Sequence, residues 1–157
     1  QDFPSAVTAQ QRLAGYRAAL EQAGLPADPA LVAEVESFHR ADGAAAMARL
    51  LDGPRPPDAV FCFNDLLALG AIRTLLERGC SVPGDVAVIG FDDIEDGRFS
   101  TPTLSTIAPD LGRIAELAVD LLAERLGEGA AAAGPPRELR VSHRLVVRES
   151  TVGRDSR

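Results

Sequence analysis

Apolar residues recur along the chain with two spacings, and these spacings predict alternating helices and strands. Where apolar residues return every three or four positions, one face of a helix is buried. This spacing predicts helices over residues 8–23, 43–51, 66–78 and 111–126. Short continuous apolar runs are typical of strands that are buried on both faces, and two occur, at residues 59–63 and 86–90. The pattern therefore predicts an α/β fold.

Residues that begin and end helices support these limits. The run Thr8-Ala9-Gln10-Gln11 is a capping box, in which a hydroxyl and an amide satisfy the first backbone groups of a helix. We expect Asp65 to cap the helix over 66–78 and Gly79 to end it. Because this helix joins the two apolar runs, the two strands are predicted to be parallel, with a right-handed crossover.

The remaining segments are less regular. Residues 31–38 are ambiguous, and we expect a short strand near 33–38. Residues 91–106 are predicted to form a long loop, which in a compact domain is more often functional than idle. The glycine- and alanine-rich stretch 127–136 is typical of a flexible linker. Apolar residues alternate over 138–148, which predicts a last strand.

Polar side chains stand where the two apolar runs end. Asn64-Asp65 follows the first run and Asp92-Asp93 follows the second. In open α/β sheets, ligands bind in the crevice beyond the carboxyl ends of the strands. We therefore expect Asn64 and Asp92 at the mouth of one crevice. Acceptors without catalytic partners suit a ligand rich in hydroxyl groups, which favours a binding module.

Composition narrows the possible functions. At 157 residues, with 46% hydrophobic residues, the chain is long enough for one domain with a core. The net charge of −7 makes these residues, by themselves, poor binders of nucleic acid. The two cysteines have neither metal-ligand spacing nor a disulfide framework, and no apolar stretch approaches the ~20 residues of a membrane span. We expect no metal, no cofactor and no membrane contact.

Seven motifs, in this order, resemble the effector-binding domain of the lactose-repressor (LacI/GalR) family of bacterial transcriptional regulators. They extend from Arg12 to Thr151, over nearly the whole chain. The motifs are Arg12-Leu13-Ala14-Gly15-Tyr16, Pro57-Asp58-Ala59-Val60-Phe61, Asn64-Asp65-Leu66-Leu67-Ala68-Leu69-Gly70-Ala71, Gly79 with Val82-Pro83-Gly84-Asp85-Val86, Val88-Ile89-Gly90-Phe91-Asp92-Asp93, Pro102-Thr103-Leu104-Ser105-Thr106-Ile107, and Leu145-Val146-Val147-Arg148-Glu149-Ser150-Thr151.

The resemblance implies a two-lobed, type I periplasmic-binding-protein-like fold with the effector between the lobes. We expect mostly the C-terminal lobe here, incomplete, because the family's N-terminal helix-turn-helix and most of its first lobe have no counterpart in the sequence. By analogy, residues 1–108 belong to the C-terminal lobe. Residues 109–136 form a crossover helix and linker of the N-terminal lobe. Residues 137–157 return to the C-terminal lobe as a strand and tail.

The resemblance also implies which residues bind the effector. Arg12, Asn64 and Asp92 match positions that contact it. Phe38 and Phe63 are either an apolar platform beneath a sugar or ordinary core residues, and the sequence leaves both alternatives open. We expect Asp93 to bind the backbone of its own loop.

The expected function is therefore that of a cytoplasmic, homodimeric transcriptional repressor or regulator controlled by a small effector such as a sugar or polyol. Operator DNA would be bound only through the N-terminal helix-turn-helix. Dimer contacts are expected from residues 66–78 and 94–100, which match regions that pair in the family.

Two other functions are compatible with parts of this pattern. A periplasmic sugar-binding protein of an ABC uptake system shares the fold, but the 82–86 motif, the paired aspartates and the chain ending favour a regulator. An enzyme that hydrolyses nucleotides needs a glycine-rich loop with a lysine, and all 16 basic residues are arginines. We expect no enzymatic activity.

Overall fold

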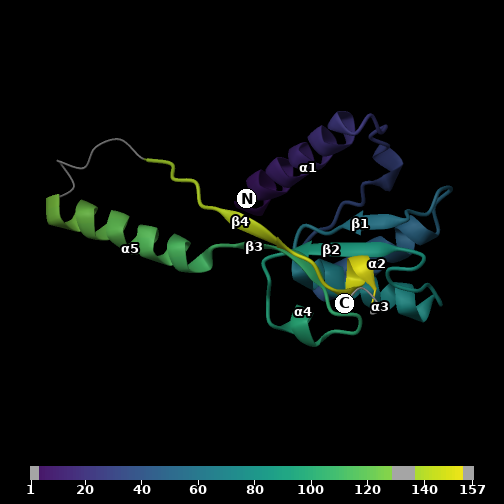
Figure 1. Cartoon of the computed structure of the whole chain (residues 1–157). Helices are drawn as coiled ribbons and strands as arrows, with labels where there is room; N and C mark the ends of the chain where they lie inside the picture. The colour runs from purple at the N-terminus through teal and green to yellow at the C-terminus, as the bar shows by residue number, and fades with distance from the viewer. Residues whose placement is uncertain (1–3, 129–136, 154–157) are drawn as a thin grey trace.

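The computed structural model describes residues 4–128 and 137–153, which form a four-stranded sheet with helices on both faces (Figure 1). The sheet order is β1-β2-β3-β4. The strands are β1 (Ala59–Phe61), β2 (Ala87–Phe91), β3 (Ser105–Pro109) and β4 (His143–Val146). The helices are α1 (Pro4–Gln22), the 3-10 helix η1 (Pro29–Leu31), α2 (Arg40–Leu51), α3 (Asp65–Glu77), α4 (Asp96–Phe99), α5 (Leu111–Glu128) and α6 (Glu149–Val152).

The predicted parallel pairing of the two apolar strands is confirmed. β1 and β2 run parallel with Val60 opposite Val88. β3 continues the sheet in the same direction, and β4 is antiparallel to β3. The carboxyl ends of β1, β2 and β3 therefore lie along one edge of the sheet.

One face of the sheet is covered by α3, with α2 packed against it. The core between these layers contains Met47 from α2, Leu75 from α3 and Val88 from β2, each exposed by 1% or less. Cys62, which follows β1, lies in the same core, and burial, with a smaller contribution from Asp65, raises the pKa of its thiol to about 12. The predicted apolar stripe of α3 is thus the face that builds the core.

Two glycines allow α2 and α3 to cross at close range. A Cβ atom at Gly70 would lie 1.9 Å from the carbonyl oxygen of Arg40, and one at Gly43 would lie 2.1 Å from the carbonyl oxygen of Leu67. Both contacts are with backbone, which cannot rotate away as a side chain can. The packing of the two helices therefore requires glycine at both positions.

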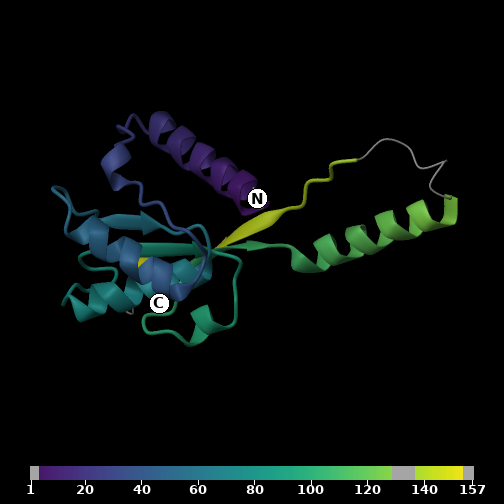
Figure 2. The same cartoon turned by 180° about the vertical axis from the view of Figure 1, so that it is seen from behind.

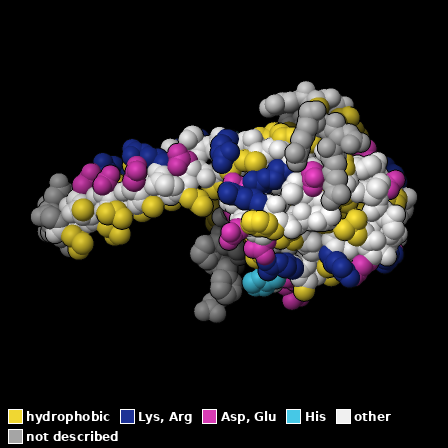
Figure 3. Space-filling model, turned by 60° about the horizontal axis from the view of Figure 1, so that its bottom comes forward, with side chains coloured by type: hydrophobic (Ala, Val, Ile, Leu, Met, Phe, Trp, Pro, Cys, Tyr) yellow, Lys and Arg dark blue, Asp and Glu magenta, His cyan; other side chains and the backbone are white. Residues whose placement is uncertain are grey.

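The helices on the other side of the sheet are less enclosed. Figures 1 and 2 show α1 on the face opposite α2 and α3, and α5 projecting away from the sheet. Apolar side chains gather along one side of α5, with charged ones opposite (Figure 3). The exposed ones are Leu111, Ile114, Val119, Leu122 and Leu126. No described helix has the length and apolarity needed to cross a membrane.

Several predicted helix limits are wrong. α1 begins at Pro4, so Thr8 lies inside it and cannot be its cap. Asn64 caps α3 instead of Asp65, because the Oδ1 atom of Asn64 accepts a hydrogen bond of 2.8 Å from the backbone N–H of Leu67. α2 begins at Arg40 and not at residue 43, and His39 and Asp42 form a capping box at its start.

The irregular segments also differ from the prediction. Residues 33–38 form no strand, and α2 follows them directly. The segment 91–106 contains α4 and the start of β3, whose small polar residues gave no strand signal. The last strand is shorter than 138–148, because its ladder ends where His143 meets Pro109, the last residue of β3. The predicted linker 127–136 lies largely outside the described residues, and α5 continues to Glu128.

We expect Gly70→Ala to lower the free energy of unfolding by about 1–3 kcal/mol or more, since the added methyl group meets the backbone of α2. Gly15→Ala is the matched control, because a Cβ atom at Gly15 has nothing within 4 Å. This control should be neutral or stabilising by up to about 1 kcal/mol, as alanine favours helix. Urea unfolding followed by circular dichroism measures both, and equal effects would contradict the close crossing.

Candidate functional site

The guanidinium of Arg12 joins α1 to the carboxyl edge of the sheet. It donates a hydrogen bond to the carbonyl oxygen of Phe63, just after β1. Its NH2 atom lies 3.9 Å from Oδ1 of Asp92, just after β2. Its Cζ atom lies 3.9 Å from the ring centroid of Phe91, a cation–π contact. One side chain thus contacts the carboxyl ends of β1 and β2.

The other candidate residues connect to the same place. The amide nitrogen of Asn64 donates a hydrogen bond of 3.0 Å to the carbonyl oxygen of Phe38. The rings of Phe38 and Phe63 meet edge to face, with centroids 6.5 Å apart. The five residues that the sequence singled out are therefore linked by pairwise contacts into one group, which we call the edge cluster (Arg12, Phe38, Phe63, Asn64 and Asp92).

The side chains of the edge cluster differ in how far contacts within the chain already occupy them. Asn64 caps α3 with its oxygen and binds Phe38 with its nitrogen, which leaves it one N–H and one lone pair. Phe38 and Phe63 both pack against the hydrophobic core. Arg12 and Asp92 have side-chain exposures of 18% and 42%. Of the two charged members, Asp92 is therefore the more open to a ligand.

Burial opposes the charges of Arg12 and Asp92 more strongly than their attraction favours them. Burial lowers the pKa of the Arg12 guanidinium, although Asp92 acts in the opposite direction. Burial raises the pKa of Asp92, with Asp65 adding to this effect and Arg12 opposing it. At 3.9 Å the pair is also longer than a good hydrogen bond. A donor and an acceptor are thus present side by side without fully satisfying each other.

Asp65, which the sequence predicted to be a helix cap, lies beneath this edge and has another role. Its side chain is buried, with the residue 1% exposed. One oxygen accepts a hydrogen bond of 2.6 Å from the hydroxyl of Thr106, and the other accepts one of 2.9 Å from the N–H of Ile94. Burial raises the pKa of this carboxyl despite the two hydrogen bonds. The aspartate after Asn64 therefore ties α3 to β3 and to the segment after β2.

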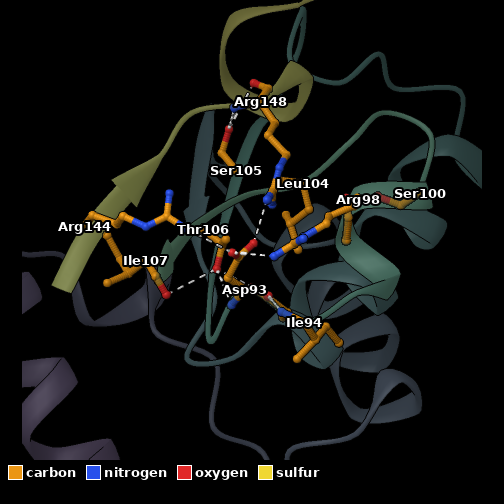
Figure 4. A network of polar contacts seen from close by, with 12 residues as sticks. Asp93, Ile94, Arg98, Ser100, Leu104, Ser105, Thr106, Ile107, Arg144 and Arg148 are labelled. Atoms are coloured by element: carbon orange, nitrogen blue, oxygen red, sulfur yellow. Dashed lines mark hydrogen bonds and ion pairs between the residues drawn. The ribbon is translucent and has the colours of Figure 1, made fainter. Parts of the chain in front are cut away.

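The sequence suggested that the side chain of Asp93 binds the backbone of its own loop, and this prediction is wrong. The carboxylate of Asp93 instead meets three arginines, from α4, from β4 and from the segment just after β4 (Figure 4). NH2 of Arg148 donates at 2.6 Å, NH2 of Arg98 at 3.0 Å, and Arg144 lies 3.7 Å away. Burial alone would raise the pKa of Asp93, but the hydrogen bonds and charges of Arg148 and Arg98 together lower it. No sequence spacing indicated this cluster.

Two hollows lie away from the edge cluster. One of about 580 Å³ lies between residues 30–36 and α2. Another, of about 360 Å³, lies where α5 begins beside β4. Neither of these two hollows is lined by a residue of the edge cluster. Among the residues that the structure describes, no group of three or more side chains could hold a metal ion.

Comparisons with known proteins agree with this architecture. Residues 1–151 match the periplasmic binding protein-like domain family. The HTH-type transcriptional repressor PurR of Haemophilus influenzae is 38% identical over 143 residues, which cover 91% of this chain and 42% of that protein. A solved structure described as a LacI-family transcriptional regulator from Sanguibacter keddieii is 53% identical, with a TM-score of 0.88 over 92% of this chain and 54% of that one. The regulator CelR, solved with cellobiose, is 37% identical, with a TM-score of 0.81. That match covers 88% of this chain and 41% of CelR.

The parallel sheet and its polar edge define the ligand-binding, periplasmic binding protein-like domain of a transcriptional regulator. The chain belongs to the LacI family. The predicted family and fold class are therefore confirmed, and the regulator interpretation stands over the uptake protein. LacI-family regulators are not enzymes. The chain spans less than half the length of the curated relatives that it matches.

We expect Asp93→Asn to lower the free energy of unfolding by about 2–4 kcal/mol at pH 7, because it leaves the partly buried Arg148 without its counter-charge. The folded-state pKa of Asp93 is lowered, so its contribution is present above the unfolded pKa of about 3.9 and is lost as the pH falls through the folded value. The difference between variant and unaltered protein should therefore vanish in acid.

The control is Asp96→Asn, which removes the same charge from an exposed pair with Arg40. It should change the free energy of unfolding by no more than about 1 kcal/mol. Urea unfolding at pH 7 and at about pH 3 measures both variants. A loss in Asp93→Asn that is equal at the two pH values would contradict the ionic origin of the effect.

Proposed function

We propose that this chain binds a small effector rich in hydroxyl groups, a sugar or a related polyol, and that Arg12, Asn64 and Asp92 hold it. One observation carries the proposal: a guanidinium and a half-exposed carboxylate stand side by side at the carboxyl edge of the sheet, neither fully paired. Cellobiose bound to CelR, and sucrose bound to a LacI-family regulator of Lactobacillus casei, support this class of effector.

The chemistry of the pair fits a hydroxyl group. A hydroxyl both donates and accepts, so one ligand group can accept from Arg12 while donating to Asp92. Adjacent hydroxyls on a ring extend the same contact to the remaining N–H of Asn64. Because the pair is neutral overall, a neutral ligand leaves no uncompensated charge. Each hydrogen bond to a charged partner contributes about 1.5–3 kcal/mol.

Phe38 and Phe63 have the second role in this proposal. Their rings are only partly buried, and they adjoin the residues that would bind the hydroxyl groups. An aromatic surface at that place would contact the apolar face of a sugar ring. Both rings also pack against the hydrophobic core, which gives them a structural role as well.

The same proposal extends to the longer protein. It assigns residues 1–108 and 137–157 to the C-terminal lobe and 109–136 to the N-terminal lobe. The exposed apolar side of α5 supports this division, since a second lobe would cover it. Effector binding would bias the closure of the lobes. An N-terminal helix-turn-helix would bind operator DNA, which places the regulator in the cytoplasm.

Arg12→Ala should weaken effector binding about 10–100-fold, because it removes a charged hydrogen bond. Thermal shift with a panel of mono- and disaccharides first identifies a binding sugar for the full-length regulator. Isothermal titration calorimetry then compares the variant with Arg17→Ala, an exposed arginine on the same helix, which should bind as the unaltered protein does. An unchanged affinity for Arg12→Ala would remove Arg12 from the site.

A homodimer is also part of the proposal, with α3 and residues 94–100 at the interface. Phe99 is 79% exposed and Leu76 on α3 is 46% exposed, which suits a surface that a partner covers.

Phe99→Ser should weaken dimerisation about 30-fold, since buried aromatic anchors carry about 2 kcal/mol or more of binding free energy. Analytical ultracentrifugation of the full-length regulator measures it, with Leu25→Ser, another exposed apolar residue, as the control. If the unaltered regulator and both variants sediment equally as dimers, Phe99 is excluded from the interface.

A further inference from the structure

The turn that carries Asp92 has an unfavourable backbone conformation. Asp92 has φ 111° and Asp93 has φ 54°, two consecutive residues other than glycine at positive φ. Aspartate tolerates the left-handed region better than most residues, but Asp92 lies beyond its usual range near φ +57°. Such conformations are costly and persist only where the surroundings hold them. Something near the turn must therefore stabilise it.

Backbone hydrogen bonds hold the turn on one side. The N–H of Asp92 donates to the carbonyl oxygen of Ile107 at 2.9 Å, which extends the pairing of β2 and β3 by one residue. The N–H of Ile94 donates to buried Asp65 at 2.9 Å. The N–H of Asp93 makes a longer contact of 3.4 Å with the hydroxyl of Thr106. The backbone contacts therefore hold the first and the last residue of the turn more closely than the middle one, Asp93.

The carboxylate of Asp93 supplies the remaining support, mainly through Arg148. These two side chains are 8% and 17% exposed and meet at 2.6 Å, whereas Arg98 and Arg144 are 55% and 71% exposed. Water and salt weaken the attraction of exposed partners. The buried pair is therefore the stronger contact.

Arg148 is itself held firmly at this position. Its NH1 atom donates to the carbonyl oxygen of Leu104 at 2.8 Å, so the planar guanidinium binds two acceptors at once. Its backbone N–H donates to the hydroxyl of Ser105 at 2.7 Å. Two residues later, the hydroxyl of Ser150 donates to the carbonyl oxygen of Val88 at 2.6 Å. The arginine is thus anchored on β2 and β3, the strands from which the turn departs.

We propose that Asp93 is a positioning residue: held by Arg148, it fixes the turn 92–94 and so presents Asp92 to the effector. The part that concerns the effector rests on the function proposed above. Asp93 itself faces the arginines and not the edge cluster, so it acts through Asp92. Arg148 belongs to the segment that follows β4, so the pair also links the turn to the part of the chain that returns from α5 (Figure 4).

Hydrogen–deuterium exchange of the full-length regulator, read by mass spectrometry, tests the proposal. The amides of residues 92–94 all donate hydrogen bonds and should exchange slowly. In Arg148→Gln we expect their exchange to rise at least about 10-fold while the interior of β2 stays protected. Arg144→Gln is the matched control, since it removes the same charge from an exposed partner of the same carboxylate, and it should leave the turn unchanged.

Asp93→Asn provides a second variant if Arg148→Gln does not fold, because asparagine has the same shape and tolerates positive φ. It should raise exchange at 92–94 in the same way. Exchange within twofold of the unaltered protein would overturn the positioning role. A uniform rise across β1, β2 and β3 would also overturn it, since that is the result of a general loss of stability.

Binding of cellobiose and sucrose, measured by calorimetry, separates this inference from the proposed function. If either sugar binds the unaltered protein, Asp93→Asn should weaken it at least about 10-fold. If Asp93→Asn exchanges faster at residues 92–94 but binds the sugar with unchanged affinity, the inference that Asp93 presents Asp92 to the effector is overturned. If neither sugar binds, that result counts against the proposed function, and the exchange measurement still decides whether Asp93 and Arg148 fix the turn.

Discussion

The buried carboxylate of Asp65 is the contact on which the carboxyl edge of the sheet depends. It connects α3, β3 and the turn after β2 through hydrogen bonds to Thr106 and Ile94. The helix can bring this carboxylate so close to the strand only because residue 90 is glycine, where a Cβ atom would lie 2.1 Å from Oδ1 of Asp65. The neighbouring Asn64 caps the same helix. Two adjacent polar residues thus set the geometry beneath the edge cluster.

This arrangement separates the residues that build the edge from those that remain open to a ligand. Asp65 and Asp93 are enclosed and satisfied by partners within the chain. The side chain of Asp92, in contrast, is 42% exposed and makes only a long contact with Arg12. This incomplete pairing lowers the stability of the fold, because the long contact does not fully compensate the partial burial of the two charges. It also leaves hydrogen-bonding capacity that a ligand can use.

Much of this fold follows from sequence patterns. The stripe of α3, the two apolar runs and the polar residues at their ends predicted the parallel pairing and the edge where Asn64 and Asp92 lie. The order of the motifs identified the family. β3 escaped notice because its small polar residues, such as Ser105 and Thr106, are buried by neighbouring strands and hydrogen bonds rather than by their own hydrophobicity. The arginine cluster around Asp93 was not predicted because its closest partner, Arg148, lies 55 residues further along the chain.

The burial of Cys62 has a practical consequence for studying lobe motion in this regulator. Thiol reagents attack the thiolate, and at neutral pH Cys62 is enclosed in the core and remains protonated. The only other cysteine in the sequence, Cys80, is partly accessible just beyond the end of α3. Among the residues of this chain, a maleimide fluorophore would therefore label one defined point, beyond the end of α3 opposite to Asn64, without any cysteine having to be engineered.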